Sequence, residues 1–202
     1  MKIALTGGIA CGKSLLSKFL NELGVETLDA DDVVHELLPD PEERRRIAAE
    51  VFSDPEKRRA LEAKIHPVVK EKIDAWLDRT SGTNRTTGTD VTNGTGACPV
   101  SLGGLVCPVR VAIIPLLFEA HWEKNFDIIC CVVSSREKQI ERMMTTRGMT
   151  LAEAEARLAA QMPVEEKAKL SHYVIRNDGT ADELRAEAQK LVAWLKTSTL
   201  QL

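Results

Sequence analysis

The sequence has no long hydrophobic run, and aromatic residues make up only 4% of its 202 residues. Its apolar stretches fall well short of the roughly 20 residues that a membrane-spanning helix needs. The apolar run after Met1 is also too short for a secretory leader, and glycines follow it directly. We therefore expect a cytoplasmic protein with no membrane partner.

Neither sign of charge predominates in the sequence. The 27 Lys and Arg residues and the 30 Asp and Glu residues leave a formal net charge of −3. A slightly acidic chain has no whole-surface attraction for a phosphate backbone. We expect no nucleic-acid partner.

Cysteine pairs with Cys-x-x-Cys spacing are absent. The five cysteines are Cys11, Cys98, Cys107, Cys130 and Cys131. No histidine lies near them at the spacing of a zinc finger, so the pattern indicates neither a structural metal nor a disulfide framework. We expect free thiols.

Short apolar segments alternate with helical patterns along the chain, and this alternation predicts an α/β fold with a parallel sheet flanked by helices. Strands are expected at residues 2–5, 25–28, 109–117, 128–133 and 173–175. The runs at 109–117 and 128–133 are continuously apolar and rich in β-branched residues, which places them at the centre of the sheet. A closing amphipathic helix is expected at 181–195.

The length predicts one domain over residues 1–202. Two segments differ from its α/β core. Residues 39–79 are charged and helical in pattern, with breaks expected at Pro55 and Pro67, and they predict a helical subdomain. Residues 80–108 begin with a run of Thr, Gly and Asn that has too little apolar content to order itself. We expect a flexible insertion there.

The chemistry is concentrated after the first strand. Residues 7–14 read GGIACGKS and fit the pattern G-x-x-x-x-G-K-[ST] between an expected strand and an expected helix. In such a P-loop, backbone N–H groups face phosphate oxygens, Lys13 neutralises the β- and γ-phosphates, and the Ser14 hydroxyl binds Mg²⁺. The predicted ATP-binding residues here are Gly7, Gly8, Ala10, Cys11, Gly12, Lys13, Ser14 and Leu15.

An acidic cluster follows the second expected strand, at the edge of the sheet where the P-loop also lies. Asp29 and Asp31 are two residues apart and would point to opposite sides of a continuing strand. We therefore assign Asp31 to the hydroxyl of the phosphoryl acceptor and Asp29 to support of the metal. The alternative is that Asp31 or Asp32 caps a helix.

Arginines follow the central strands, where positive charge could stabilise a phosphoryl-transfer transition state. Arg136, Arg142 and Arg147 occur there, and the last two flank a helix end just before Gly148. A lid that closes over the phosphates could carry them. The alternative is that they are ordinary exposed helical arginines. Helical patterns continue to residue 170 and are interrupted at Gly148 and Pro163.

The chain resembles the dephospho-CoA kinase family nearly end to end. The resemblance is carried by residues 4–9 leading into Gly12-Lys13-Ser14, by residues 28–31, by His66-Pro67, by residues 115–119 (PLLFE), by Gln139, Arg142, Arg147 and Gln161, and by Asn177 with Gly179. The family phosphorylates the 3′-hydroxyl of dephospho-CoA with ATP, as the last step of coenzyme A synthesis. The resemblance therefore implies a P-loop kinase core with a helical acceptor-binding subdomain and a lid at about residues 136–163.

The resemblance also implies site residues. Asp31 looks like the catalytic aspartate, together with Lys13, Arg142 and Arg147. Thr6 and His66 look like further acceptor contacts, and Asn177 like a residue of the loop that holds adenine. The alternative for His66-Pro67 is a helix boundary.

The sequence departs from the family pattern in a shorter region before His66, in the 80–108 insertion and in Leu15, where the family often has threonine. Because a P-loop does not choose the acceptor, a kinase for another small metabolite or nucleotide remains an alternative. A nucleotide-binding protein that has lost catalysis is another. The expected partners are ATP and dephospho-CoA, and the expected state is a monomer or small homo-oligomer.

Overall fold

The computed structural model describes residues 1–38, 40, 42, 46–47, 55–79 and 109–198. The chain divides into two compact units, residues 1–27 with 80–202 and residues 28–79. The expected insertion at 80–108 lies outside the described residues. The expected helical subdomain, residues 39–79, falls within the second unit.

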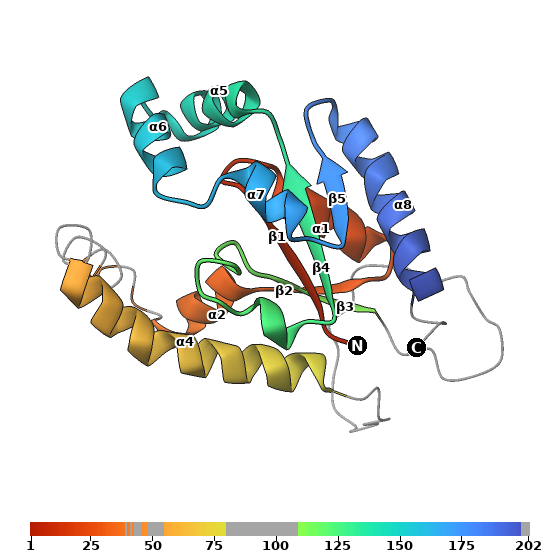
Figure 1. Ribbon diagram of the computed structural model, residues 1–202, viewed down its shortest axis with the longest axis horizontal. Coiled ribbons are helices and arrows are strands. Elements are labelled where there is room, and N and C mark those ends of the chain that lie inside the picture. The colour runs from red at the N-terminus through yellow and green to blue at the C-terminus, as the bar shows by residue number, and fades with distance from the viewer. Residues whose placement is uncertain (39, 41, 43–45, 48–54, 80–108, 199–202) are drawn as a thin grey trace, which may run out of the picture. The chain divides into compact units, whose positions relative to one another are not determined.

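The first unit is built on a five-stranded sheet with the order β2-β3-β1-β4-β5 (Figure 1). The strands are β1 (Ile3–Gly7), β2 (Glu26–Asp29), β3 (Arg110–Ile113), β4 (Ile128–Val133) and β5 (Tyr173–Arg176). Every residue of β1 and β4 is buried. The expected parallel α/β architecture is confirmed, and β3 and β4 flank the central strand as their apolar runs predicted.

Parallel pairing brings the carboxyl ends of three strands together. β1 pairs in parallel with β3 and β4, and β4 pairs in parallel with β5. Gly7 lies opposite Val132, and Val133 lies opposite Arg176. The residues that follow β1, β4 and β5 therefore meet at one edge of the sheet, which is where open α/β sheets bind their ligands.

Helices cover both faces of this sheet. In Figure 1, α7 (Val164–Lys169) lies in front of the sheet, and α1 (Lys13–Glu22) lies behind it beside α8 (Ala181–Ser198). α8 buries residues at helical spacing along one side: Leu184, Ala188, Leu191, Val192 and Leu195. Two more helices, α5 (Arg136–Arg147) and α6 (Leu151–Ala159), follow β4, and a short 3₁₀ helix, η1, spans Glu123–Asn125.

The expected breaks at Gly148 and Pro163 are confirmed, because α5, α6 and α7 are separated there. The strand expected at 109–117 is too long. β3 ends at Ile113, and a series of turns covers residues 115–121. Pro115 has no N–H to donate to a strand ladder, and its carbonyl instead accepts hydrogen bonds from two side chains.

The second unit contains α2 (Ala30–Leu37) and α4 (Pro55–Leu77). Lys72 of α4 bridges to Glu36 of α2 at 3.2 Å, and Val69 and Ile73 of α4 are buried. The break expected at Pro67 is wrong, since Pro67 lies inside α4. His66-Pro67 is therefore not a helix boundary, and the helix continues despite the hydrogen bond that proline removes.

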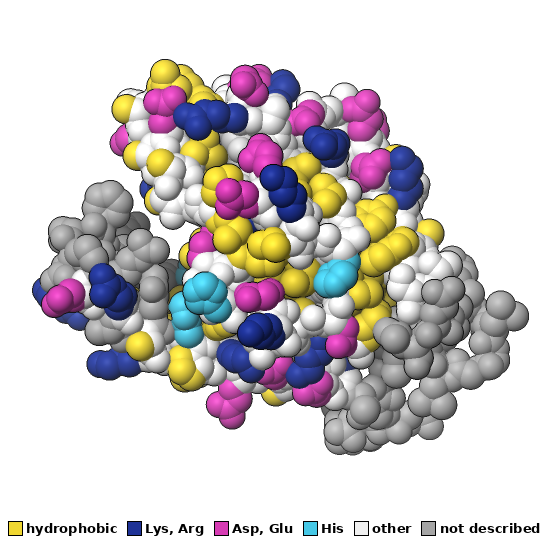
Figure 2. Space-filling model, viewed as in Figure 1, with side chains coloured by type: hydrophobic (Ala, Val, Ile, Leu, Met, Phe, Trp, Pro, Cys, Tyr) yellow, Lys and Arg dark blue, Asp and Glu magenta, His cyan; other side chains and the backbone are white. Residues whose placement is uncertain are grey.

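On the face shown in Figure 2, charged side chains of both signs are interspersed with hydrophobic ones. This mixture agrees with the small net charge of the sequence. In the part of the chain that the structure describes, no helix combines the length and the apolar character that crossing a bilayer requires.

Candidate active site

The P-loop turns sharply between β1 and α1. Gly7 has φ 148° and Gly12 has φ 91°, backbone conformations that favour glycine. Space is equally restrictive, because a Cβ added at Gly7 would lie 2.3 Å from the Val132 carbonyl oxygen. Ala10 also has a positive φ, 56°. The glycines of the motif are therefore required by backbone geometry and by the close approach of β4.

Lys13 and Ser14 open helix α1. The ammonium of Lys13 donates to the carbonyls of Gly7 and Gly8 at 3.0 and 2.9 Å, so its charge lies over the loop. Ser14 is exposed, and so is Leu15. An exposed hydroxyl beside the N-terminus of a helix, where the dipole favours anions, suits a metal–phosphate complex.

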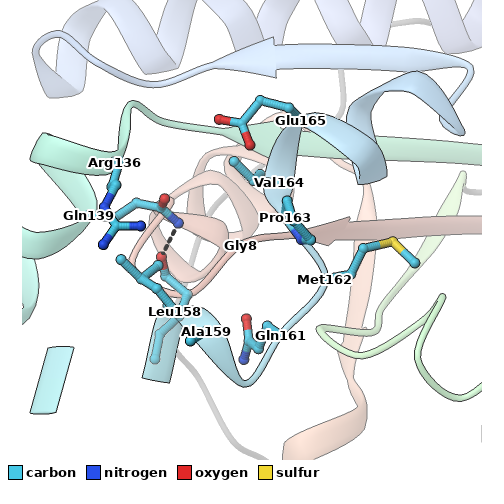
Figure 3. A pocket seen from close by; sticks show the side chains of 11 residues that line it. Gly8, Arg136, Gln139, Leu158, Ala159, Gln161, Met162, Pro163, Val164 and Glu165 are labelled. Carbon is cyan, nitrogen blue, oxygen red and sulfur yellow. Dashed lines mark hydrogen bonds between the residues drawn. The ribbon is translucent and has the colours of Figure 1, made fainter. Parts of the chain in front are cut away.

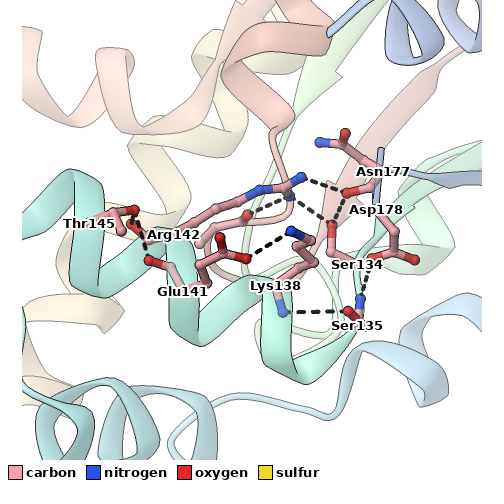
Figure 4. A network of polar contacts seen from close by, with 9 residues as sticks. Ser134, Ser135, Lys138, Glu141, Arg142, Thr145, Asn177 and Asp178 are labelled. Atoms are coloured by element: carbon pink, nitrogen blue, oxygen red, sulfur yellow. Dashed lines mark hydrogen bonds and ion pairs between the residues drawn. The ribbon is translucent and has the colours of Figure 1, made fainter. Parts of the chain in front are cut away.

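Arg142 of α5 joins three segments at the carboxyl edge of the sheet (Figure 4). Its guanidinium donates to the Ala10 carbonyl at 3.2 Å, to the Ser134 hydroxyl at 2.9 Å and to the Asn177 carbonyl at 2.8 Å. Ser134 is buried, and its hydroxyl donates to the Asn177 carbonyl at 2.6 Å. Arg142 thus positions the P-loop against the segments that follow β4 and β5.

Asn177 completes this network from the end of β5. Its backbone N–H continues the ladder by donating to the Val133 carbonyl at 2.9 Å. Its side-chain amide donates to the Cys11 carbonyl at 2.8 Å. Asn177 therefore lies directly against the P-loop.

Gln139 forms a second link between α5 and the P-loop. Its side chain is buried, and Nε2 donates to the Ile9 carbonyl at 2.8 Å and to Cys11 Sγ at 3.1 Å. Gln139 also lines a cavity of about 300 Å³ (Figure 3). The other lining residues are Gly8, Ile9, Arg136, Leu158, Ala159, Gln161, Met162, Pro163, Val164 and Glu165.

This cavity is lined by Gly8 and Ile9 of the P-loop and by residues of the expected lid. Arg147 is exposed in the last turn of α5, and Gly148 ends that helix with φ 63°. α6 then begins at a capping box formed by Thr150 and Glu153. Arg136 bridges α5 to α6 through Glu155 at 3.1 Å. The structure thus separates the two expected lid arginines, with Arg142 bonded to the core and Arg147 at the surface.

Thr6 lies in β1, immediately before the P-loop glycines, and is completely buried. Its hydroxyl donates to the Pro115 carbonyl at 3.3 Å. Lys167, also completely buried, donates to the same carbonyl at 2.9 Å and pairs with Glu119 at 2.8 Å.

Sequence reasoning assigned no role to Ser134, Lys167 or Glu119. One signal was available for Lys167: in the short α7 it follows Val164 by three residues, which places a charge on the face that the helix buries. A charged residue at such a position needs a partner.

The second unit holds the acidic cluster and His66. Asp29 is the N-cap of α2, and its Oδ1 accepts from the Asp31 N–H at 3.0 Å. The capping residue is thus neither Asp31 nor Asp32, because the helix already begins at Ala30. Asp31 and Asp32 are exposed in its first turn, and His66 is half-buried in α4.

The cysteines of the described residues, Cys11, Cys130 and Cys131, are free and buried, as expected for thiols. Burial raises the pKa of Cys11 and raises the pKa of Cys130 and of Cys131 to about 12. Cys98 and Cys107 lie outside the described residues. Over the described ranges, no three His, Cys, Asp or Glu side chains gather as a metal site.

The chain is similar to known proteins over most of its length. The family model described as dephospho-CoA kinase matches residues 1–43 and 104–183. A dephospho-CoA kinase from Synechococcus is 34% identical, and the alignment covers 93% of this chain and 90% of that protein. The crystal structure of a Thermus thermophilus protein has 30% identity, a TM-score of 0.70 and coverage of 96% of this chain and 97% of its own.

A dephospho-CoA kinase structure from Campylobacter jejuni shares the fold. It is 23% identical with a TM-score of 0.65, and the match covers 98% of this chain and 100% of that one. The family model matches more than half of this chain, and a curated relative is 34% identical to it. The chain belongs to the dephospho-CoA kinase family.

Proposed function

We propose that this protein transfers the γ-phosphoryl group of ATP to the 3′-hydroxyl of dephospho-CoA, giving coenzyme A and ADP as the last step of coenzyme A synthesis. The observation that carries the proposal is the P-loop, held between β1, α5 and Asn177 in a chain that belongs to the dephospho-CoA kinase family. We expect the reaction to take place in the cytoplasm.

The P-loop supplies the phosphate site of this mechanism. Backbone N–H groups of residues 8–15 and the N-terminus of α1 bind the phosphates, and the Lys13 ammonium neutralises the β- and γ-phosphoryl oxygens. Asn177, which follows β5 and bonds to the Cys11 carbonyl, is assigned to the loop that holds adenine on the resemblance. Positioning and electrostatics supply most of the catalysis, because the protein forms no covalent bond to the phosphoryl group.

The exposed Ser14 hydroxyl fits a magnesium ion bound with ATP. Held by Ser14, such an ion would offset the negative charge that develops on the phosphate oxygens. Asp29 supports this site less directly, since its Oδ1 accepts the Asp31 N–H. That capping hydrogen bond stabilises the first turn of α2 and so fixes the backbone position of Asp31.

Asp31 is the residue that we assign to the acceptor. Its carboxylate accepts the proton of the 3′-hydroxyl, or orients that hydroxyl, for in-line attack on the γ-phosphorus. Thr6 and His66 are assigned to the acceptor on the resemblance. Arg142 and Arg147 are assigned to the transferring phosphoryl group on the resemblance, although Arg142 is bonded to the Ala10 and Asn177 carbonyls and Arg147 is exposed.

The test is a measurement of ADP release with Mg²⁺·ATP, with and without dephospho-CoA, and with the product identified by mass. We expect ADP release to depend on dephospho-CoA and coenzyme A to form in equal amount. Lys13→Ala should abolish turnover and weaken ATP binding. ATP binding without acceptor-dependent ADP release would contradict the proposal, and preferred turnover of another acceptor would replace dephospho-CoA as the substrate.

A further inference from the structure

Lys167 is the largest side chain that the described core buries completely. It lies on α7, on the same side as the buried Val164. Its ammonium has two charge-assisted contacts, 2.8 Å to Glu119 Oε1 and 2.9 Å to the Pro115 carbonyl oxygen. A lysine is almost never buried to this extent without such partners.

These two contacts lead to two different parts of the candidate site. The Pro115 carbonyl also accepts the Thr6 hydroxyl at 3.3 Å, and Thr6 immediately precedes the P-loop glycines. Glu119 Oε1 also accepts the backbone N–H of Met162 at 3.1 Å. Met162 lies in the linker between α6 and α7, at the carboxyl end of the expected lid, and lines the cavity beside the P-loop.

Stability alone is a weak reason for this arrangement. The Lys167 ammonium loses its hydration on burial, whereas the Glu119 side chain keeps 24% exposure, and an apolar pair of similar volume is often as stable as a buried ion pair. The pairing is also incomplete, because Glu119 Oε2 is buried without a hydrogen-bond partner among the described residues. What the charged pair supplies, and an apolar pair could not, is a donor to Pro115 and an acceptor for Met162.

We propose that Lys167 is a positioning residue for phosphoryl transfer: through Pro115 and Glu119 it holds the substrate end of β1 and the lid linker in one fixed arrangement. The inference rests on the proposed function for its assay. Lys167 itself touches no reacting group. Its ammonium satisfies the Pro115 carbonyl, so the Thr6 hydroxyl can turn toward the acceptor without leaving that carbonyl unpaired.

The Glu119 side of the pair acts on the lid. α7 packs on β1 and β4, whereas α6 packs on α5 and is bounded by Gly148 and by the 160–163 linker. A hydrogen bond from Met162 to a carboxylate fixed by Lys167 marks the point at which a moving α6 would meet a stationary α7. Hinges of this kind are a few residues at the ends of elements.

The experiment separates positioning from stability with the double variant Lys167→Met with Glu119→Gln. This variant removes the ammonium without leaving a buried unpaired carboxylate. The matched control is Lys190→Met with Glu187→Gln, an ion pair of 2.7 Å on α8 in which Lys190 is exposed. For each protein we would measure kcat, both KM values, ATP affinity without acceptor, and the thermal unfolding midpoint.

We expect the Lys167 double variant to unfold near the wild-type temperature and bind ATP alone normally, while kcat falls about tenfold or more and the KM for dephospho-CoA rises. The control pair should leave all of these quantities unchanged. A Lys167 double variant with wild-type kcat and KM would overturn the proposal. So would a uniform loss that follows the unfolding midpoint, because it would reduce Lys167 to a structural residue.

A measurement on the unmodified protein keeps the proposal testable if the double variant does not fold. Amide hydrogen exchange should show the Met162 N–H protected, because it donates to Oε1 of Glu119. Exchange at the unprotected rate would contradict the anchor. If wild-type protein failed to turn over dephospho-CoA, the proposed substrate would fail, whereas protection of Met162 would still test the anchor.

Discussion

The Asn177 side chain closes the P-loop, because its amide Nδ2 donates to the Cys11 carbonyl oxygen at 2.8 Å across 166 residues of sequence. The same Nδ2 leaves no room beside the loop, since a Cβ added at Gly12 would lie 2.2 Å from it. Asn177, at the end of β5, therefore restricts position 12 of the P-loop to glycine.

Gly12→Ala should damage both folding and nucleotide binding. Gly12 combines φ 91° with the contact to Asn177, so alanine would be strained and would also displace the Asn177 amide. Gly148→Ala is the matched control, because Gly148 has φ 63° but nothing within 4 Å of an added Cβ. We expect Gly148→Ala to cost about 1 kcal/mol of unfolding free energy with normal ATP binding, and Gly12→Ala to cost more and to weaken ATP binding. Denaturant unfolding and ATP titration would measure both, and equal effects would contradict the role of Asn177.

Arg142→Lys should weaken ATP binding almost as much as Arg142→Ala. One ammonium cannot replace a planar guanidinium that reaches the Ala10 and Asn177 carbonyls and the Ser134 hydroxyl together. We expect a rise in the ATP dissociation constant of about tenfold, which corresponds to roughly 1.4 kcal/mol. Lys138→Ala on the same helix removes only an exposed pair with Glu141 and should change nothing. Full activity of the lysine variant would show that charge alone is needed at position 142.

Substitution by asparagine should have different effects at Asp29 and at Asp31. Asparagine also caps helices, so Asp29→Asn should preserve α2, protein stability and turnover. Asp31→Asn removes the proposed base and should reduce kcat severely while ATP affinity stays normal. Steady-state kinetics and ATP titration of the two variants provide the comparison. Loss of activity in Asp29→Asn with an intact fold would instead support a direct part for Asp29 at the metal.

The buried thiols of Cys130 and Cys131 should make stability fall at alkaline pH. Burial raises their pKa from 9.0 to about 12, so the unfolded chain loses these protons at lower pH than the folded protein does. Their contribution to stability is therefore complete below pH 9 and declines between pH 9 and about 12, by about 1.4 kcal/mol per pH unit for each thiol at most.

Guanidinium unfolding at a series of pH values would measure this decline. The double variant Cys130→Ala with Cys131→Ala removes both thiols, so its stability should depend less on pH across the same interval. An unchanged pH dependence would assign the decline to other groups.

Local patterns along the chain predicted much of the fold. Hydrophobic periodicity located the five strands and the helices that cover the sheet, because it depends only on which faces of each element must be buried. The P-loop was equally visible, since its glycines, Lys13 and Ser14 are adjacent in sequence. The errors occurred near two prolines, Pro67 and Pro115, where the local pattern did not decide whether the element ended. Pro67 was expected to end a helix that continues through it, and the strand after residue 109 was expected to pass Ile113.

Eight consecutive residues encode a phosphate-binding loop, so the class of chemistry can be read without the fold. The distant residues that support this loop are known only from the folded chain. Asn177 bonds to Cys11, Arg142 to the Asn177 carbonyl and Lys167 to the Pro115 carbonyl, across 166, 35 and 52 residues of sequence. Such pairings depend on the register of parallel strands, in which Gly7 meets Val132 and Val133 meets Arg176, and no local pattern contains that register.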